Sequence, residues 1–135
     1  MHISASVWNS NRQNKVTVNT NDSSKELAIP HKPEGKGSSV NGGELLFLAL
    51  ATCFCNDIYR EAAKRGMEVT SVKVDVSGEF GGEGEPGSNI QYEVKVVADA
   101  PDDEVRDLIA YVDKIAEVHN TLRAGTPVTL LQNKS

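Results

Sequence analysis

The chain has 135 residues, of which 39% are hydrophobic and 24% are charged, a composition typical of one globular domain. Its net charge of -5 argues against a nucleic-acid or anionic-membrane partner, since both attract clustered lysine and arginine. The longest apolar run, residues 45–55, is about half of the roughly 20 residues that a membrane-spanning helix needs. We therefore expect a single domain over residues 1–135 that does not span a membrane.

Two features of the sequence bear on the location of the protein. The first fifteen residues have no cationic head followed by an apolar stretch, so they do not resemble a signal peptide. Two cysteines in a chain without such a signal indicate reduced thiols rather than a disulfide framework. These features predict a cytoplasmic protein.

The first part of the chain is predicted to form three strands. Apolar residues alternate with polar ones over residues 3–7 and again over 15–20, and the polar segment 9–14 between them predicts a turn. The short segment 26–30 follows as a third strand. Residues 31–43 are rich in glycine, serine and proline, which predicts a loop.

A long helix is predicted from Gly43 to Arg65. Its first half is apolar on nearly all sides, with Leu46, Ala49, Leu50 and Cys53 at helical spacing. Its second half is amphipathic, ends in basic residues and meets Gly66, where a left-handed C-cap is expected. A helix that is apolar all round needs more cover than one small sheet provides, so we expect a homodimer with this helix near its centre.

The second half of the chain is predicted to contain two long strands, residues 68–80 and 88–99, joined by a glycine-rich connection. A second helix is expected over residues 101–118, because acidic residues oppose its dipole at the start and an apolar stripe, extended by His119, runs along it. Residues 127–132 are expected to form a closing strand. The order β-β-β-α-β-β-α-β predicts an α+β fold.

Both cysteines, Cys53 and Cys55, lie in the most apolar part of the chain. Residues two apart on a helix point about 200° apart, so the two thiols should face different surroundings and not form a disulfide with each other. The C-x-C spacing is one residue shorter than a C-x-x-C site, and the three histidines are scattered, so we expect no metal and no cofactor. Buried cysteine is often only a small hydrophobe; a nearby positive group that lowers the thiol pKa makes it a nucleophile.

Three further residues are candidates for a site. Arg12, in the first polar turn, is the candidate for the positive group, and a solvated turn residue is the alternative. Asn41 and Glu44 have the spacing of a capping box, so Glu44 either caps the helix or takes part in the chemistry. His119 either interacts with the helix dipole, lies half-buried or acts in catalysis. The loop 35–43 lacks the ending of a P-loop and is interpreted as a flexible lead into the helix.

The segment ELLFLALATC, the glycine-rich loop before it and the closing TLRAGTPVTLL resemble the OsmC/Ohr family over nearly the whole chain. The resemblance implies an intertwined homodimer, with two long helices packed back to back inside wrapped sheets. It also implies a thiol peroxidase that reduces organic hydroperoxides at the dimer interface. In active members a cysteine on the first helix attacks the peroxide and a second cysteine resolves the product.

Carried onto this sequence, the resemblance assigns the peroxidatic role to Cys53, which precedes a phenylalanine as in the family. Arg12 matches the turn arginine of the organic-hydroperoxide branch. That branch has its glutamate where this chain has Gly43, and Glu44 is one place later, as in the broader OsmC-like branch. The region of the resolving cysteine, residues 116–119, contains no thiol, and Cys55 has no catalytic counterpart.

These observations leave three functional hypotheses. The first is a thiol-dependent redox protein that reduces organic hydroperoxides through Cys53, with Arg12 and Glu44 tuning the thiol and an external thiol as reductant. The second is a non-catalytic protein that binds a small apolar ligand at the dimer interface. The third is a fold retained for an interaction, with Cys53 inert. We favour the first hypothesis.

Overall fold

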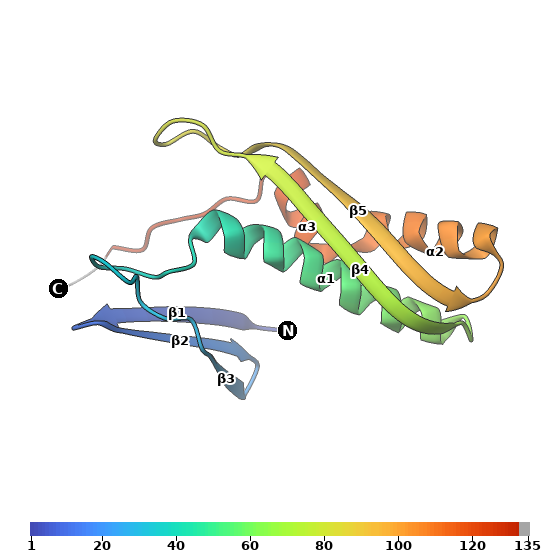
Figure 1. Cartoon of the computed structure of the whole chain (residues 1–135), viewed down its shortest axis with the longest axis horizontal. Helices are drawn as coiled ribbons and strands as arrows, with labels where there is room; N and C mark the ends of the chain where they lie inside the picture. The colour runs from blue at the N-terminus through green and yellow to red at the C-terminus, as the bar shows by residue number, and fades with distance from the viewer. Residues whose placement is uncertain (133–135) are drawn as a thin grey trace. The chain divides into compact units, whose positions relative to one another are not determined.

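The computed structural model describes residues 1–132. They form two compact units, Met1–Leu45 and a second unit that begins at Leu46. The elements, in chain order, are β1 (Ile3–Ser10), β2 (Gln13–Thr20), β3 (Ser23–Leu27), α1 (Gly42–Lys64), β4 (Glu68–Glu79), β5 (Ser88–Asp99), α2 (Asp102–Ile115) and α3 (Glu117–Arg123) (Figure 1). This confirms the predicted α+β class. Within the described residues, no helix combines the length and apolarity needed to cross a membrane.

The first unit is a three-stranded antiparallel sheet in the order β1-β2-β3. The two-residue turn between β1 and β2 has positive φ at both Asn11 (46°) and Arg12 (64°), which is the pattern of a type I′ hairpin. The third strand begins at Ser23, earlier than the predicted segment 26–30, which is a correction. A second tight turn, with Asn21 at a φ of 51°, reverses the chain at once, so pairing begins immediately after it.

Helix α1 agrees with the predicted bounds to within one residue at each end. At its start the side chain of Asn41 accepts a hydrogen bond from the backbone N–H of Glu44 (2.8 Å), and the Glu44 carboxylate accepts one from the backbone N–H of Asn41 (2.9 Å). At its end Gly66 adopts a φ of 66°. Both predicted caps, the capping box and the left-handed glycine, are therefore confirmed.

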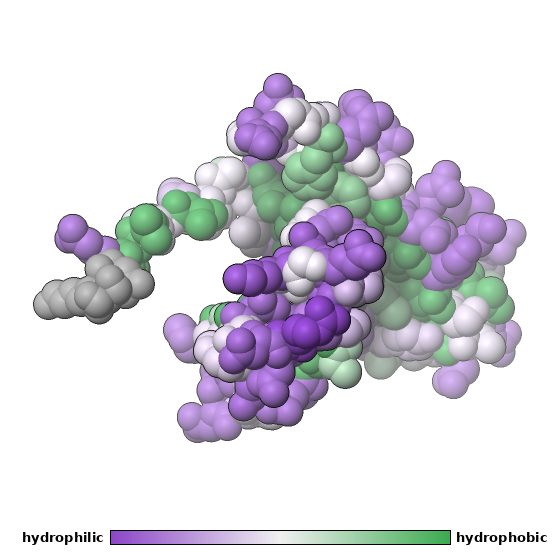
Figure 2. All heavy atoms as spheres, turned by 60° about the vertical axis from the view of Figure 1, so that its left-hand side comes forward, coloured by the Kyte–Doolittle hydropathy of each residue, from purple (hydrophilic) through white to green (hydrophobic). Residues whose placement is uncertain are grey.

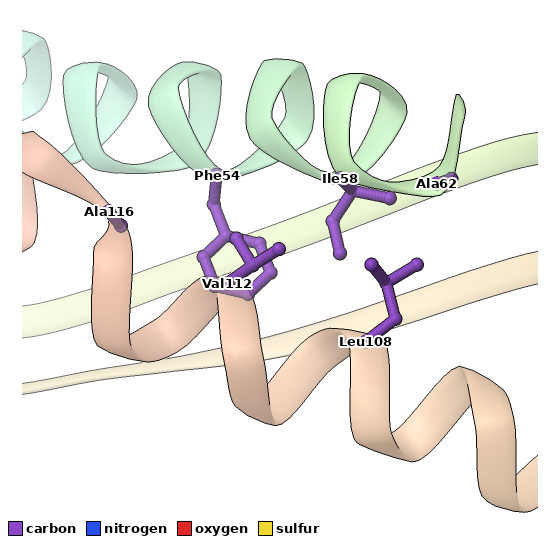
Figure 3. Packing of buried hydrophobic residues seen from close by; sticks show 6 residues of the cluster. All are labelled: Phe54, Ile58, Ala62, Leu108, Val112 and Ala116. Carbon is purple, nitrogen blue, oxygen red and sulfur yellow. The ribbon is translucent and has the colours of Figure 1, made fainter. Parts of the chain in front are cut away.

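The second unit has its core between two helices and one face of the β4–β5 hairpin. Phe54, Ile58 and Ala62 on α1 point toward Leu108 and Val112 on α2 (Figure 3). Val72 pairs with Val96 and Val74 pairs with Val94 across the hairpin. Alternate residues of the two strands face this core, as the sequence predicts. The strand side chains packed on the core are Val69, Val72, Val74, Tyr92, Val94 and Val96.

The predicted second helix, residues 101–118, is in fact two helices. The chain leaves α2 at Ala116, which has extended angles (φ -64°, ψ 113°), and re-enters a helix at Glu117. No glycine or proline marks this break in the sequence. Ala116, at the break, and His119, on α3, are both buried.

The predicted closing strand, residues 127–132, does not form in the single chain, which is a second correction. A strand requires a sheet edge with which to exchange hydrogen bonds, and no described strand of this chain pairs with this segment. Its apolar side chains are exposed, with Val128 at 99% and Leu130 at 94%. Figure 2 shows this hydrophobic segment as green spheres along an extended tail.

Candidate functional site

The candidate nucleophile Cys53 lies on α1, partly buried beside the core of the second unit. Its Sγ is 3.8 Å from Oδ2 of Asp57 and 3.8 Å from Oε2 of Glu117, so the single S–H can donate to either carboxylate. The sulfur and one oxygen of each carboxylate all lie within 4.8 Å of one another. Cys53 is therefore surrounded by acidic rather than basic groups of its own unit.

The local structure explains how these three groups meet. Asp57 follows Cys53 by four residues on α1, so the two side chains lie one turn apart on the same helix face. Glu117 is the first residue of α3, and it reaches the thiol because the chain breaks at Ala116. The position of Asp57 was readable from the helical spacing, whereas the position of Glu117 depends on a break that the sequence does not signal.

Arg60 holds the buried carboxylate of Asp57 in place. Asp57 is only 4% exposed, and its Oδ1 accepts a hydrogen bond of 2.8 Å from Nη1 of Arg60. The same guanidinium donates through Nε to Glu61 (2.9 Å). Arg60 therefore pairs with Oδ1 of Asp57, and Oδ2 faces the thiol. The buried negative charge of Asp57 is thus balanced by a hydrogen-bonded cation.

The surroundings of Cys53 oppose ionisation of its thiol. Burial raises the pKa of Cys53 above its ordinary value, and the negative charges of Asp57 and Glu117 raise the pKa further, while hydrogen bonding to the backbone of Val118 acts in the opposite direction. Burial also raises the pKa of the Asp57 carboxyl. The groups of this unit thus keep the thiol protonated, and activation of Cys53 requires a positive charge from elsewhere.

Cys55 lies apart from this cluster, as predicted. It lines a shallow hollow between α1 and β4, together with Ala51, Thr52, Asn56, Val72, Lys73 and Val74. Neither cysteine forms a disulfide. The prediction that the two thiols face different surroundings is confirmed.

The other two predicted site residues, Arg12 and Glu44, belong to the first unit. Arg12 is exposed in the β1–β2 turn. Glu44 forms the capping box of α1, so its structural role is established. The contribution of either residue to the chemistry of Cys53 remains a prediction.

His119 is far more buried than the half-buried residue that the sequence suggested. It is 4% exposed, and neither ring nitrogen has a hydrogen-bond partner within the described residues. Its ring lies 4.9 Å from that of Tyr92 and 5.7 Å from that of Phe54, measured between centroids. Burial lowers the pKa of His119, so the neutral imidazole is favoured.

Next to His119 is a small cavity of about 220 Å³. It is mostly apolar and is lined by Leu50, Ile90, Tyr92, His119, Leu122 and Arg123. The hydroxyl of Tyr92 donates to Oδ1 of Asp113, which also accepts a bond of 2.8 Å from Arg123. These bonds lower the pKa of Asp113, the Tyr92 bond most strongly, so this part of the wall is an ordered ionic cluster.

The Cys53 cluster also contains the donor atoms of a metal site. A thiolate and two carboxylate oxygens are ligands that zinc accepts. Within residues 1–132, Cys53, Asp57 and Glu117 form the one group of three such side chains close enough to share an ion. The sequence did not indicate that Asp57 and Glu117 both lie beside Cys53, and the absence of a metal remains a prediction.

Comparison with protein families shows that residues 35–131 match the family described as OsmC-like protein. Comparison with curated protein sequences finds no match. Among solved structures, the chain is similar to an OsmC-like protein from Mycoplasma pneumoniae, with 18% identity, a TM-score of 0.63 and coverage of 90% of this chain and 86% of that chain. It is also similar to an OsmC-like protein of unknown function from Vibrio cholerae, with 16% identity, a TM-score of 0.65 and coverage of 90% of this chain and 93% of that chain. A third similar structure is an organic hydroperoxide resistance protein OsmC from Legionella pneumophila, with 20% identity, a TM-score of 0.52 and coverage of 91% of this chain and 90% of that chain.

Proposed function

We propose that this chain, which belongs to the OsmC-like protein family, is a thiol-dependent redox protein that reduces organic hydroperoxides through Cys53. The observation that carries the proposal is the position of Cys53, a partly buried thiol on α1 within the residues that match the family. A solved structure named as an organic hydroperoxide resistance protein has the same fold.

The proposed reaction begins when the Cys53 thiolate attacks the terminal oxygen of a hydroperoxide. A sulfur–oxygen bond forms and the oxygen–oxygen bond breaks, which gives a sulfenic acid on Cys53 and an alcohol after the leaving alkoxide takes a proton. An external thiol then attacks the sulfenic acid, releasing water and forming a mixed disulfide. A second external thiol restores Cys53 and leaves as the oxidised disulfide, so two thiols are consumed for each peroxide.

The external reductant is needed because the chain has no resolving cysteine. Its sequence contains two cysteines, and Cys55 lies in a hollow on the β4 side of α1, apart from the cluster of acids around Cys53. A disulfide between the two requires local opening of α1. A thiol from solution or from another protein meets no such requirement.

The proposal assigns the activation of Cys53 to Arg12, assisted by Glu44. The acids around the sulfur raise the thiol pKa, so a guanidinium in contact with the sulfur is needed to populate the thiolate. Arg12 is a suitable donor because no described side chain pairs with it. Glu44 is proposed to orient this arginine in addition to capping α1.

The active form is proposed to be a homodimer. Leu48 on α1 is 59% exposed, and the apolar tail with Val128 and Leu130 is almost fully exposed. Apolar surface of this extent is unfavourable in a monomer and is typical of an interface. A second copy of the chain would cover α1 and provide a sheet edge for the tail.

The proposal is tested by the ionisation and oxidation of Cys53 in the intact protein. Alkylation by iodoacetamide is followed at graded pH in the variant Cys55→Ser, so that only Cys53 reacts. A pKa near or above about 8.5, the value of a free thiol, contradicts a peroxidase, and a pKa below about 7 contradicts an inert thiol. After exposure to cumene hydroperoxide, Cys53 should gain one oxygen by mass spectrometry, and the variant Cys53→Ser should not.

A second candidate function is binding of a small apolar ligand without catalysis. The cavity beside His119, about 220 Å³ in volume with several apolar side chains in its wall, favours this candidate. Saturable binding of cumyl alcohol that persists in Cys53→Ser and is lost in Leu122→Trp, which fills the cavity, would support it. Peroxide turnover that disappears with Cys53 would support the first function instead.

A further inference from the structure

A larger cavity, of about 560 Å³, lies within the first unit. It is formed by the end of β1, the turn that follows it and the tip of the loop before α1. Its lining consists of Asn9, Ser10, Asn11, Arg12, His31, Gly35, Lys36 and Gly37. The lining of this cavity shares no residue with the cluster around Cys53, whose members all belong to the second unit.

The charge of this cavity is opposite to that of the whole chain. The protein carries a net charge of -5, yet the lining contains Arg12 and Lys36 and no acidic residue. Within residues 1–132, neither cation forms an ion pair. The imidazole of His31 belongs to the same lining. Two uncompensated cations in one concavity attract an anion.

The conformation of Arg12 indicates that its side chain is required at this position. Its φ of 64° lies in the left-handed region, where a residue with a side chain costs roughly 1–2 kcal/mol relative to glycine. This position of a type I′ turn usually holds glycine. An arginine held there despite the cost indicates a role for its guanidinium.

The loop that carries Lys36 is held by hydrogen bonds at several points. His31 and Ser38 form an antiparallel bridge, and the backbone N–H of Lys32 donates to the carbonyl of Gly37 (2.9 Å). The amide of Asn14, on β2, donates to the carbonyl of Ile29 (2.8 Å). The loop is thus folded into a small hairpin of its own and tied to the sheet.

The tip of this loop offers backbone donors as well as a cation. Gly35 and Gly37 have φ values of 84° and 108°, which other residues rarely adopt. Within the described part of the chain, the backbone N–H groups of Gly35, Lys36 and Gly37 have no hydrogen-bond acceptor. Unpaired amides in a glycine-rich turn are suited to an anionic oxygen.

From these features we infer that the cavity between the β1–β2 turn and the glycine-rich loop binds a polar organic anion that carries a phosphate or carboxylate group. Arg12 and Lys36 contact the anionic group, and a guanidinium is well matched to either oxyanion. The volume exceeds that of an inorganic anion, and the remaining lining, Asn9, Ser10 and Asn11, is suited to hydroxyl or amide groups of the ligand. The cavity lining contains no Val, Leu, Ile, Met, Phe, Tyr or Trp side chain, so a hydrocarbon chain is a poor occupant.

This inference does not rest on the proposed redox function. The two proposals share Arg12, but binding uses residues of the first unit alone, whereas the redox proposal also requires the sulfur of Cys53. The variant Cys53→Ser therefore separates the two: it should lose peroxide reduction and keep anion binding. If it binds the anion and the unaltered protein reduces no peroxide, the redox proposal fails and this one stands.

The test is a titration of the full-length protein, labelled with nitrogen-15, at constant ionic strength. The probes are glucose 6-phosphate, gluconate, inorganic phosphate and uncharged glucose. The amide signals of Arg12, Lys36 and Gly37 should shift saturably with an anionic probe and remain unchanged with glucose. Saturation by glucose 6-phosphate but not gluconate identifies a phosphate site, and the reverse result identifies a carboxylate site.

Variants assign the binding to the two cations. Arg12→Gln and Lys36→Gln should each raise the Kd about tenfold or more, because a hydrogen bond to a charged group is worth about 1.5–3 kcal/mol. Lys25→Gln is the matched control: it removes one positive charge from β3 of the same unit, outside the cavity, and should leave the Kd unchanged. The inference is overturned by the absence of saturable shifts with all three anions at millimolar concentration. It is equally overturned if Lys25→Gln weakens binding as much as Lys36→Gln does.

Discussion

The sulfur of Cys53 lies 3.8 Å from a carboxylate oxygen of Asp57, one turn further along the same helix. An acidic neighbour at this distance disfavours the thiolate, which is the form of cysteine that reacts with peroxides. Because Asp57 is buried and held by Arg60, it cannot move away as an exposed side chain could. This contact therefore adds to the effect of burial in raising the pKa of Cys53.

Replacing Asp57 with asparagine should lower the pKa of Cys53. The change removes a negative charge beside the sulfur, while the amide keeps nearly the same volume and an oxygen for Arg60. In the Cys55→Ser background, the pH profile of iodoacetamide alkylation should move to lower pH. Asp75→Asn, which removes an exposed carboxylate from β4, serves as the control and should leave the profile in place. An unchanged profile in Asp57→Asn would contradict the role of this carboxylate.

Replacing Arg12 with glutamine should slow the oxidation of Cys53 by cumene hydroperoxide by about 10- to 100-fold, the equivalent of a lost hydrogen bond to a charged group. The reason is that the proposed site depends on this guanidinium to offset the two acids around the sulfur. The rate is measured by mass spectrometry of the oxidised protein at fixed pH. Arg106→Gln, on α2, should react at the original rate, and equal rates in both variants would remove Arg12 from the site.

Replacing Phe54 with alanine should reduce the free energy of unfolding by about 3–5 kcal/mol, the usual cost of deleting a buried aromatic ring. Phe54 has no exposed surface and lies at the centre of the contact between α1 and α2 (Figure 3). Urea denaturation at fixed protein concentration measures the loss. Phe80→Ala removes a ring that is half exposed and should cost clearly less; similar losses would show that the core is elsewhere.

Replacing His119 with phenylalanine should make stability less dependent on pH. Burial lowers the pKa of His119 in the folded state, so the unfolded chain takes up a proton that the folded chain excludes. The free energy of unfolding is therefore not reduced by His119 above about pH 6.5, the pKa of histidine in the unfolded chain. It falls as the pH decreases from there toward the pKa of His119 in the folded protein. Between pH 7 and pH 5.5 the unaltered protein should lose more stability than His119→Phe. Identical losses would mean that the imidazole is not held neutral.

Replacing Leu48 with aspartate should dissociate the proposed homodimer. Leu48 is exposed on α1, and a carboxylate at a covered apolar interface remains without a partner, which costs several kcal/mol. Sedimentation velocity should show a dimer for the unaltered protein and a monomer for the variant. Ala110→Asp, a matched change at an exposed position of α2, should stay dimeric. A monomeric unaltered protein would contradict the proposal outright.

The sequence predicted the elements whose signals are local. The apolar stripe and two capping motifs located α1 to within a residue at each end, because helix ends are determined by hydrogen bonds among neighbours. Alternation located β4 and β5, and glycine-rich segments marked the loops. The break at Ala116 was missed because no glycine or proline near it marks the end of a helix.

The candidate site also contains features that local sequence predicts and features that only the tertiary structure determines. Cys53 as the candidate thiol, its separation from Cys55 and the capping by Glu44 all follow from spacing along one helix. The two acids that raise the pKa of Cys53 differ in how far their positions are predictable. The position of Asp57 follows from its spacing on α1, but Glu117 reaches the sulfur only because α3 packs against α1. Likewise, the sequence shows Arg12 in a turn and Lys36 in a loop, and only the tertiary structure brings them to one cavity. Contacts between distant segments depend on how the whole chain packs, whereas helix ends, alternation and turns depend on a few adjacent residues.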